Sequence, residues 1–221
     1  VSSDVTQRQR AEEALQLMSD IGTELASSLD YEETLQKLAH TLVPCFADWC
    51  AIDLLTADSA RIERVAMVHR DPARDDAVAW FQSRPLETNE WRAGAARAVV
   101  TGKSIFVPVV TDQMIKDSGV SPEMLQVLFE VVVRSLIIVP LRARGTTIGA
   151  ITFARGDSGR LFDEDDLSVA EHLTRRAGLS VDNSRLYHEA QLIEASLRRA
   201  NEAKDEFLGL MSHELRTPIT V

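Results

Sequence analysis

The spacing of apolar residues near the N-terminus predicts two consecutive helices. Apolar side chains recur every three or four positions through residues 5–28, which is the spacing of one helix face. These side chains are Leu15, Met18, Ile21, Leu25 and, just beyond, Leu29. A second helix is expected from Asp30, which suits an N-cap with Glu33 as its capping-box partner, and Pro44 is its expected end.

Between residues 48 and 154 the pattern changes to short strand-like runs separated by short helical stretches. Strands are expected over residues 48–55, 61–69, 105–110, 136–141 and 147–154. Helices are expected over residues 71–81, 93–101 and 121–131. Asp71 and Ser121 each precede a proline, which marks a helix start, and Gly102 marks a helix end. This order predicts an α+β fold in which one antiparallel β-sheet is flanked by helices.

A long helix is expected from Asp163 to the C-terminal region. The acidic residues that follow Asp163 favour the positive end of the helix dipole. Apart from the glycines at 178 and 209, no helix-breaking residue occurs between Asp163 and Pro218, and a pattern longer than about 25 residues is typical of a coiled coil. From residue 186 onward the inner positions alternate steps of four and three, which predicts a parallel two-helix coiled coil. These positions are Leu186, Ala190, Ile193, Leu197, Ala200, Lys204, Phe207 and Met211.

Alanines and Lys204 at inner positions weaken this predicted coil. Weak packing suits a coil that switches between registers, and it is equally compatible with ordinary imperfection. The fold prediction therefore adds long N- and C-terminal helices that form a dimeric coiled coil, with a homodimer as the expected assembly.

Composition narrows the class of protein. The chain has 221 residues, of which 45% are hydrophobic and 26% are charged, enough for one core plus extended helices. The formal net charge of -10 argues against a nucleic-acid partner, because a phosphate backbone requires a basic surface. The longest apolar stretch, around residues 136–141, is too short to span a bilayer, and no signal peptide opens the chain. A cytoplasmic location without a membrane segment is expected, with an upstream anchor left open.

The two cysteines, Cys45 and Cys50, predict neither a disulfide framework nor a metal site. No further cysteine or nearby histidine completes the four ligands that a zinc ion requires. We expect both to be small buried side chains at a helix-to-strand junction.

The candidate chemistry lies in residues 207–218, with the sequence FLGLMSHELRTP. At about 100° per residue, His213 lies roughly 200° around the helix from Met211, so it points away from the apolar seam. Glu214 is adjacent, and Thr217 shares the face of His213 one turn later. This arrangement suits a histidine that accepts a phosphoryl group and passes it on.

This segment resembles the H-box of sensor histidine kinases. The matching residues are Phe207, Ser212, His213, Glu214, Leu215, Arg216, Thr217 and Pro218. The resemblance implies that the neutral imidazole of His213 attacks the γ-phosphoryl group of ATP, while Glu214 accepts a hydrogen bond from the far ring nitrogen. It also implies that Thr217 positions a water for the phosphatase reaction, and that a response-regulator receiver domain is the phosphorelay partner.

Neither a phosphate-binding P-loop nor a G-x-G-x-x-G motif occurs in the chain, and the sequence ends at Val221. ATP is therefore expected to be the substrate of a separate C-terminal kinase domain. We expect this fragment to be inactive alone and its full-length parent to be a protein histidine kinase.

A second resemblance covers roughly residues 30–185, whose C-terminal third is similar to a GAF domain. The matching residues are Pro140, Leu141, Gly149, Arg160, Phe162, Asp166, Asn183, Leu186 and Tyr187. Asp4 and Thr6 resemble the tail that closes a PAS domain. The expected organisation is a linker helix after a PAS domain (1–29), a GAF sensor domain (30–185), a signalling helix (186–206) and the start of a phosphoacceptor domain (207–221).

GAF domains often hold a small molecule between the sheet and the helices on one face. Residues expected to line such a pocket, or else to be plain core or rim, are His69, Trp80, Phe81, Trp91, Phe106 and Met114. The cysteines are not placed for a bilin, the cyclic-nucleotide residue set is missing apart from Phe162, and His69 alone is weak support for haem. The ligand stays unknown.

Together these features predict the sensory and signal-transmission part of a two-component sensor histidine kinase. The alternative is a non-catalytic dimeric ligand-binding GAF module that is phosphorylated by, or regulates, a partner protein. A third possibility is a GAF domain that only spaces and dimerises. An ATP-binding domain beyond residue 221 distinguishes the first from the second, and a bound ligand argues against the third.

Overall fold

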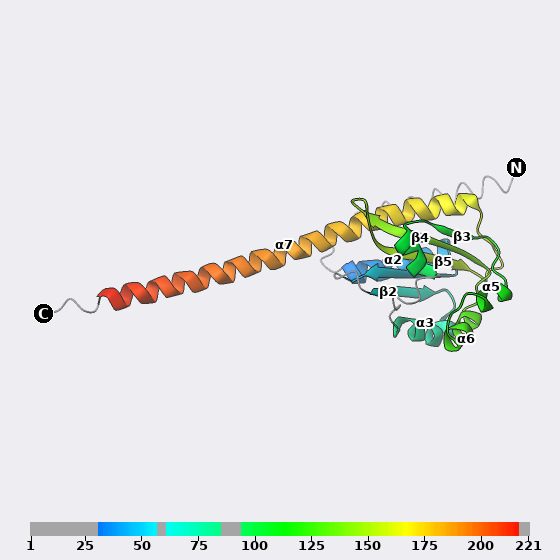
Figure 1. The fold of residues 1–221 in the computed structure, drawn as a ribbon, viewed down its shortest axis with the longest axis horizontal. Helices are drawn as coiled ribbons and strands as arrows, with labels where there is room; N and C mark the ends of the chain where they lie inside the picture. Colours follow the sequence, from blue (N-terminus) through cyan, green and yellow to red (C-terminus); the bar gives the residue numbers. More distant parts are fainter. Residues whose placement is uncertain (1–30, 57–60, 85–93, 217–221) are drawn as a thin grey trace.

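The computed structural model describes residues 31–56, 61–84 and 94–216, and Figure 1 shows their arrangement. The helix expected over residues 5–28 lies outside these residues. The elements in chain order are α2 (Tyr31–Cys45), β1 (Trp49–Leu55), β2 (Ile62–His69), a 3-10 turn (Pro72–Arg74), α3 (Asp75–Gln82), α4 (Gly94–Thr101), β3 (Ile105–Val107), α5 (Asp112–Lys116), α6 (Pro122–Glu130), β4 (Ser135–Ala143), β5 (Thr146–Arg155) and α7 (Glu164–Arg216).

The five strands form one antiparallel sheet in the order β2-β1-β5-β4-β3, which confirms the predicted sheet. A tight turn joins β4 to β5 through Arg144 and Gly145, which both have positive φ angles of 50° and 84°. Two such residues give a turn whose twist matches that of the flanking strands. Strand β5 lies between β1 and β4, and most side chains of these three strands are buried.

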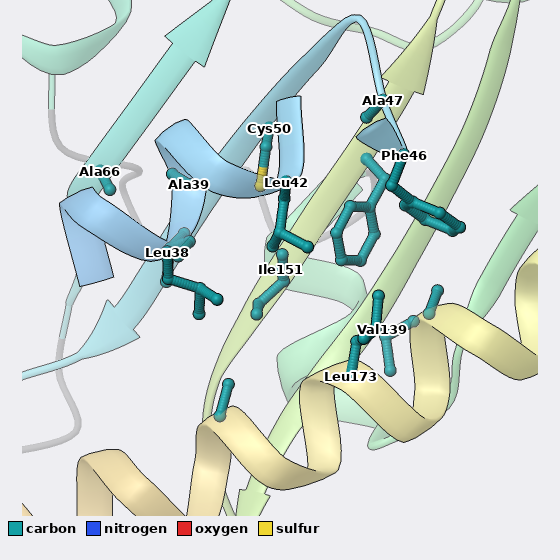
Figure 2. Packing of buried hydrophobic residues seen from close by; sticks show 14 of the residues in the cluster. Leu38, Ala39, Leu42, Phe46, Ala47, Cys50, Ala66, Val139, Ile151 and Leu173 are labelled. Atoms are coloured by element: carbon teal, nitrogen blue, oxygen red, sulfur yellow. The ribbon is translucent and has the colours of Figure 1, made fainter. Parts of the chain in front are cut away.

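Helices α2 and α7 cover one face of the sheet. Side chains that alternate along the strands point to this face and pack against both helices. Figure 2 shows Leu38 and Leu42 of α2 and Leu173 of α7 directed toward Val139 and Ile151 of the sheet. Burial on this face therefore fixes the first turns of α7 to the sheet.

The opposite face of the sheet is covered by α3, α5 and α6 at one end and by α4 at the other. Trp49, Ala51 and Met67 point to this face and pack against the first three helices. Ile138 and Ala150 pack against α4. The sheet is thus buried on both faces, in an α+β architecture of three layers (Figure 1).

Several element boundaries shift by one or two residues from the sequence prediction, and larger differences occur at β3 and α5. Helix α2 continues through Pro44 to Cys45, because proline in a last turn removes only one backbone donor. Strand β3 ends at Val107, since Pro108 that follows cannot donate to the ladder. Helix α5 is not predicted, because five residues are too short to show a helical period.

Candidate functional site

The start of α7 is fixed by a reciprocal cap. The Asp166 amide donates to the Asp163 carboxylate (2.9 Å), and the Asp163 amide donates to Asp166 Oδ2 (3.1 Å). Two free helix-end donors are thereby satisfied, as a capping box does. This confirms Asp163 as the predicted N-cap.

Arg155, at the end of β5, holds the start of α7 and the end of α2 together. Its guanidinium pairs with both oxygens of Asp166 (2.8 and 3.2 Å) and also donates to the carbonyls of Phe46 and Leu161. The group is buried, and it lies 4.0 Å from the ring centre of Phe162. A planar guanidinium can make all of these contacts at once. The sequence did not indicate this role, because the partners lie up to 109 positions away.

Further along, α7 touches the backbone of β4. Gly178 lies so close to the Arg142 carbonyl that any Cβ at position 178 would overlap it. The sequence marks Gly178 only as a helix breaker, yet α7 passes through it without interruption. Glycine here permits close approach of helix and strand.

Two side-chain pairs tie α7 to neighbouring loops. Ser104, in the α4–β3 connection, donates to Glu171 (2.6 Å), and Arg144 in the β4–β5 turn pairs with Asp182 (2.7 Å). Arg142 also donates to the Gly102 carbonyl at the end of α4 (2.6 Å). The loop after α4, on the far face of the sheet, is therefore linked directly to α7.

Beyond the sheet, α7 extends away from the domain (Figure 1). This part of the helix presents apolar side chains to solvent. Leu186, Ile193, Leu197 and Phe207 expose 37%, 56%, 61% and 60% of their surface. All four belong to the predicted inner positions of the coil. The helix thus carries an uncovered apolar seam from the sheet toward its C-terminal end.

His213 and Glu214, the candidate phosphoacceptor and its acidic neighbour, belong to the last turns of α7, which runs unbroken to Arg216. Thr217 and Pro218 lie outside the described residues. The backbone of residues 207–216, the described part of the predicted H-box, is therefore continuous with the helix that packs on the sheet.

The predicted pocket residues do not gather at one place. His69, Trp80 and Phe81 belong to the face of the sheet covered by α3, α5 and α6, where Phe81 is buried core. Phe106 packs on the opposite face against the α2–α7 core, and Met114 is exposed on α5. Trp91 lies outside the described residues. The predicted residues are divided between two faces because successive side chains of a strand point to opposite sides of the sheet, as Phe106 and its neighbour Val107 do.

Two buried donors lack partners on this face. Trp49 and His69 stand opposite each other on β1 and β2, and neither Trp49 Nε1 nor His69 Nε2 has a hydrogen-bond partner among the described residues. His69 Nδ1 accepts from the Asp71 amide (3.0 Å), so a neutral ring carries its hydrogen on Nε2. The nearest carboxylate oxygen, on Asp157, is 3.7 Å away, too far for a hydrogen bond.

A buried carboxylate, Asp48, organises the loop after β5. It accepts hydrogen bonds from the Gly156 amide, from the amide and hydroxyl of Ser158, and from Arg70. Burial alone raises the pKa of Asp48, but these hydrogen bonds outweigh it and lower the pKa to about 2. Asp48 therefore stays ionised and holds this loop in place.

An open depression of about 610 Å³ lies between the β3–α5 and β5–α7 connections, and it includes none of the predicted pocket residues. Its charged residues, Arg134 and Asp112, pair with each other (3.1 Å). Its remaining lining is largely apolar, including Val109 and Leu161.

Cys50 is buried as predicted, and burial followed by the charge of Asp53 raises the pKa of its thiol. Cys45 is exposed, so the prediction that both cysteines are buried was wrong for it; it ends α2 on the solvent side.

Within the described ranges, no cluster of three His, Cys, Asp or Glu side chains is placed to hold a metal ion. Nor do the described helices include one apolar and long enough to cross a membrane.

Among curated proteins, the chain is similar to the circadian input-output histidine kinase CikA of Thermosynechococcus vestitus, with 28% identity over 106 residues. This match covers 40% of the chain and 14% of that protein. Hybrid signal transduction histidine kinase G of Dictyostelium discoideum is 26% identical over 93 residues, covering 39% of the chain and 3% of that protein. The chain therefore corresponds to a small part of these relatives.

Solved structures share the fold at low identity. The GAF domain of an Acinetobacter phosphoenolpyruvate-protein phosphotransferase has a TM-score of 0.58 and 14% identity, over 78% of this chain and 94% of that one. Free methionine-R-sulfoxide reductase from Neisseria meningitidis has a TM-score of 0.57 and 19% identity, over 80% and 93%. A family model described as the GAF domain matches residues 30–181. The chain belongs to the GAF domain family, and its similarity to GAF regions of histidine kinases supports a role as a signalling sensor.

Proposed function

We propose that the chain is the sensory and signal-transmission part of a cytoplasmic two-component sensor histidine kinase, with His213 as its phosphoryl acceptor. The observation that carries this proposal is the course of α7, a single helix of 53 residues that starts on the GAF sheet and reaches the H-box. Similarity to histidine kinases over the GAF region supports the same class. A movement of the sheet can therefore reach His213 through one continuous helix.

In the proposed reaction, a neutral imidazole nitrogen of His213 attacks the γ-phosphorus of ATP held by a separate kinase domain. The new P–N bond forms as the bond to the bridging oxygen breaks, and ADP leaves. Glu214 accepts a hydrogen bond from the other ring nitrogen and stabilises the positive charge that develops on the ring. The phosphoryl group then passes to an aspartate of a response-regulator receiver domain.

We further propose that two copies of α7, and the N-terminal linker helices, associate as a homodimer. The exposed seam supports this, because an apolar stripe at heptad spacing along an extended helix is typical of a coiled coil. A change in the relative position of the two helices would alter how the kinase domain reaches His213.

For a small-molecule ligand, we propose a binding site on the face of the sheet that is covered by α3, α5 and α6. The uncompensated donors of Trp49 and His69 support this location, because a ligand acceptor would satisfy them. Native mass spectrometry together with a visible absorption spectrum tests it. A reproducible extra mass supports a ligand, while a colourless apo protein argues against haem and bilin and favours a domain that relays an upstream signal.

Phosphorylation in trans tests the central proposal. The 221-residue chain is incubated with radiolabelled ATP and the catalytic domain of a histidine kinase, and acid-labile phosphate is measured. Wild type should be labelled and His213→Gln should not, whereas His172→Gln, an exposed histidine of the same helix, should be labelled like wild type. Equal labelling of His213→Gln would refute the assignment. Ligand binding without labelling of the wild type would favour a non-catalytic module that only regulates a partner protein.

A further inference from the structure

The apolar seam of α7 begins before Leu186, within the part of the helix that still covers the sheet. Leu179 lies seven residues earlier and exposes 52% of its surface. Ala177 and Val181, two positions to either side, are buried against the sheet. Because a step of two residues turns a helix by about 200°, Leu179 faces away from the sheet. At this level α7 has one apolar face toward its own domain and another toward solvent.

Heptad positions counted from Leu179 place polar residues inside the seam. The d positions are Leu179, Leu186, Ile193, Ala200 and Phe207. The a positions are Asn183, Ala190, Leu197, Lys204 and Met211. Asn183, at the first a position, is exposed to solvent in the single chain. A partner that covers the seam would remove water from its amide.

The flanking positions offer no attractive charge pairs that would fix the alignment of two helices. Asp182, Glu189, Ser196 and Ala203 occupy the g positions. Ser180, Tyr187, Glu194 and Asn201 occupy the e positions. Glu189 and Glu194 would even repel each other in a parallel pair. Alignment therefore depends on the inner layers.

We infer that Asn183 sets the register of a parallel pair of α7 helices, and that the partner is a second copy of this chain. A carboxamide both donates and accepts, so Asn183 is satisfied by Asn183 of the partner subunit when the helices are parallel and unshifted. A shift of one heptad would place it against Ala190 of the partner subunit, where its amide is unpaired. This inference rests on the proposed dimer and adds its register.

The same polar residues favour a coiled coil of two helices. Without these polar residues, Ile193 at d followed by Leu197 at a would favour a coiled coil of three or four helices. Polar residues at a positions oppose this, and the charged end of Lys204 reaches water from the edge of a two-stranded seam. Asn183 and Lys204 together therefore limit the assembly to a dimer.

The Asn183 layer is attached to the sensor domain. Its neighbour Asp182 pairs with Arg144 of the β4–β5 turn (2.7 Å), and Gly178 lies against β4 one turn earlier. The register is thus set at the point where α7 leaves the sheet. A displacement of the sheet acts first on this layer.

Disulfide trapping tests the register. Both reporters are made in the 221-residue chain with Cys45→Ser. With Leu186→Cys alone, a disulfide between the two copies of position 186 reports aligned helices. In a mixture of the Leu186→Cys chain and an Ile193→Cys chain, a disulfide between positions 186 and 193 reports a shift of one heptad. We expect aligned crosslinks to predominate when residue 183 is asparagine. Asn183→Leu should raise the ratio of shifted to aligned crosslinks about tenfold or more. Gln191→Leu, which adds the same side chain at an exposed position outside the seam, should leave the ratio unchanged.

Light scattering on the same proteins separates the possible failures. Asn183→Leu combined with Lys204→Leu should form assemblies larger than a dimer. A monomeric wild type would overturn the proposed dimer itself. A dimeric wild type whose alignment and mass are unaffected by Asn183→Leu would overturn only the role of Asn183. Asn183→Ala, which removes the amide without adding bulk, must show the same increase in shifted crosslinks if the inference is correct.

Discussion

Gly178 of α7 lies directly against the backbone carbonyl of Arg142 in β4, with no room for a side chain between them. The Arg142 side chain continues from this contact to the Gly102 carbonyl at the end of α4 (2.6 Å). A residue of the sheet thus contacts α7 with its backbone and the end of α4, on the other face, with its side chain. The position of α7 on the sheet depends on this contact.

Substitution Gly178→Ala should destabilise the protein. Alanine favours a helix over glycine by about 1 kcal/mol, but its methyl group must displace backbone, and overpacking typically costs about 1–3 kcal/mol. We expect a net loss of about 1–2 kcal/mol in the free energy of unfolding, measured by urea denaturation at fixed chain concentration. Arg175→Ala, exposed on the same helix, should change it by less than about 0.5 kcal/mol. A more stable Gly178→Ala protein would contradict the close contact.

The ion pair between Arg155 and Asp166 should contribute more than any exposed charge of α7. Asp166→Ala leaves the buried guanidinium of Arg155 without its counter-charge and removes half of the capping box. Breaking a buried pair in this way costs about 3–5 kcal/mol. Asp165→Ala, an exposed acid in the same first turn, is the matched control and should cost less than about 1 kcal/mol. Similar melting of the two variants by circular dichroism would show that the pair contributes little.

Local features of the fold could be predicted from the sequence because the interactions that cause them are local. Ser121 caps α6 by accepting from the Met124 amide three residues away (3.2 Å), and the Asp71 carboxylate accepts from the Ala73 amide (3.0 Å). The β4–β5 hairpin follows in the same way from the Arg144–Gly145 turn. Each of these depends on residue types within one turn of chain.

Contacts between distant segments could not be predicted. The hydrogen bonds of Asp48 reach 108 and 110 residues along the chain, and in the sequence Asp48 is one carboxylate among many. A shift of one position along a strand moves a side chain to the other face of the sheet. Because the residues around Phe106 are all apolar, the sequence did not show which face Phe106 occupies. The resemblance to an H-box rests on a local residue pattern and stays a prediction, whereas the attachment of α7 to the sheet depends on packing.

Asp48 should make stability depend on pH in the acid range. Its folded pKa of about 2 lies below the ordinary aspartate value of 3.8, so the stabilisation is present above about pH 4 and is lost as the pH falls toward 2. Asp48→Asn should lower the free energy of unfolding by about 2 kcal/mol at neutral pH. The difference from wild type should shrink as pH falls from about 4 to about 2. A constant difference between pH 7 and pH 2.5, measured by urea denaturation, would contradict the assigned role.

Thr217 and Glu214 should affect opposite directions of phosphoryl transfer if His213 is the acceptor. Glu214→Gln removes the negative charge that stabilises the imidazole as it attacks, so the rate of His213 phosphorylation in trans should fall on the order of 10²-fold. Thr217→Ala should leave that rate close to wild type, because its hydroxyl is proposed to act only when water attacks the receiver phosphate.

The complementary measurement is dephosphorylation of a phosphorylated receiver domain by each variant. Here Thr217→Ala should be slower on the order of 10²-fold, since a poorly positioned water loses the advantage of orientation. Ser212→Ala, which removes a hydroxyl next to His213, controls for a general loss of polar groups near the histidine. If Thr217→Ala reduces both reactions equally, the hydroxyl supports the structure of the helix end instead of the attacking water. A change in only one direction assigns Thr217 to phosphatase chemistry and keeps Glu214 with the kinase step.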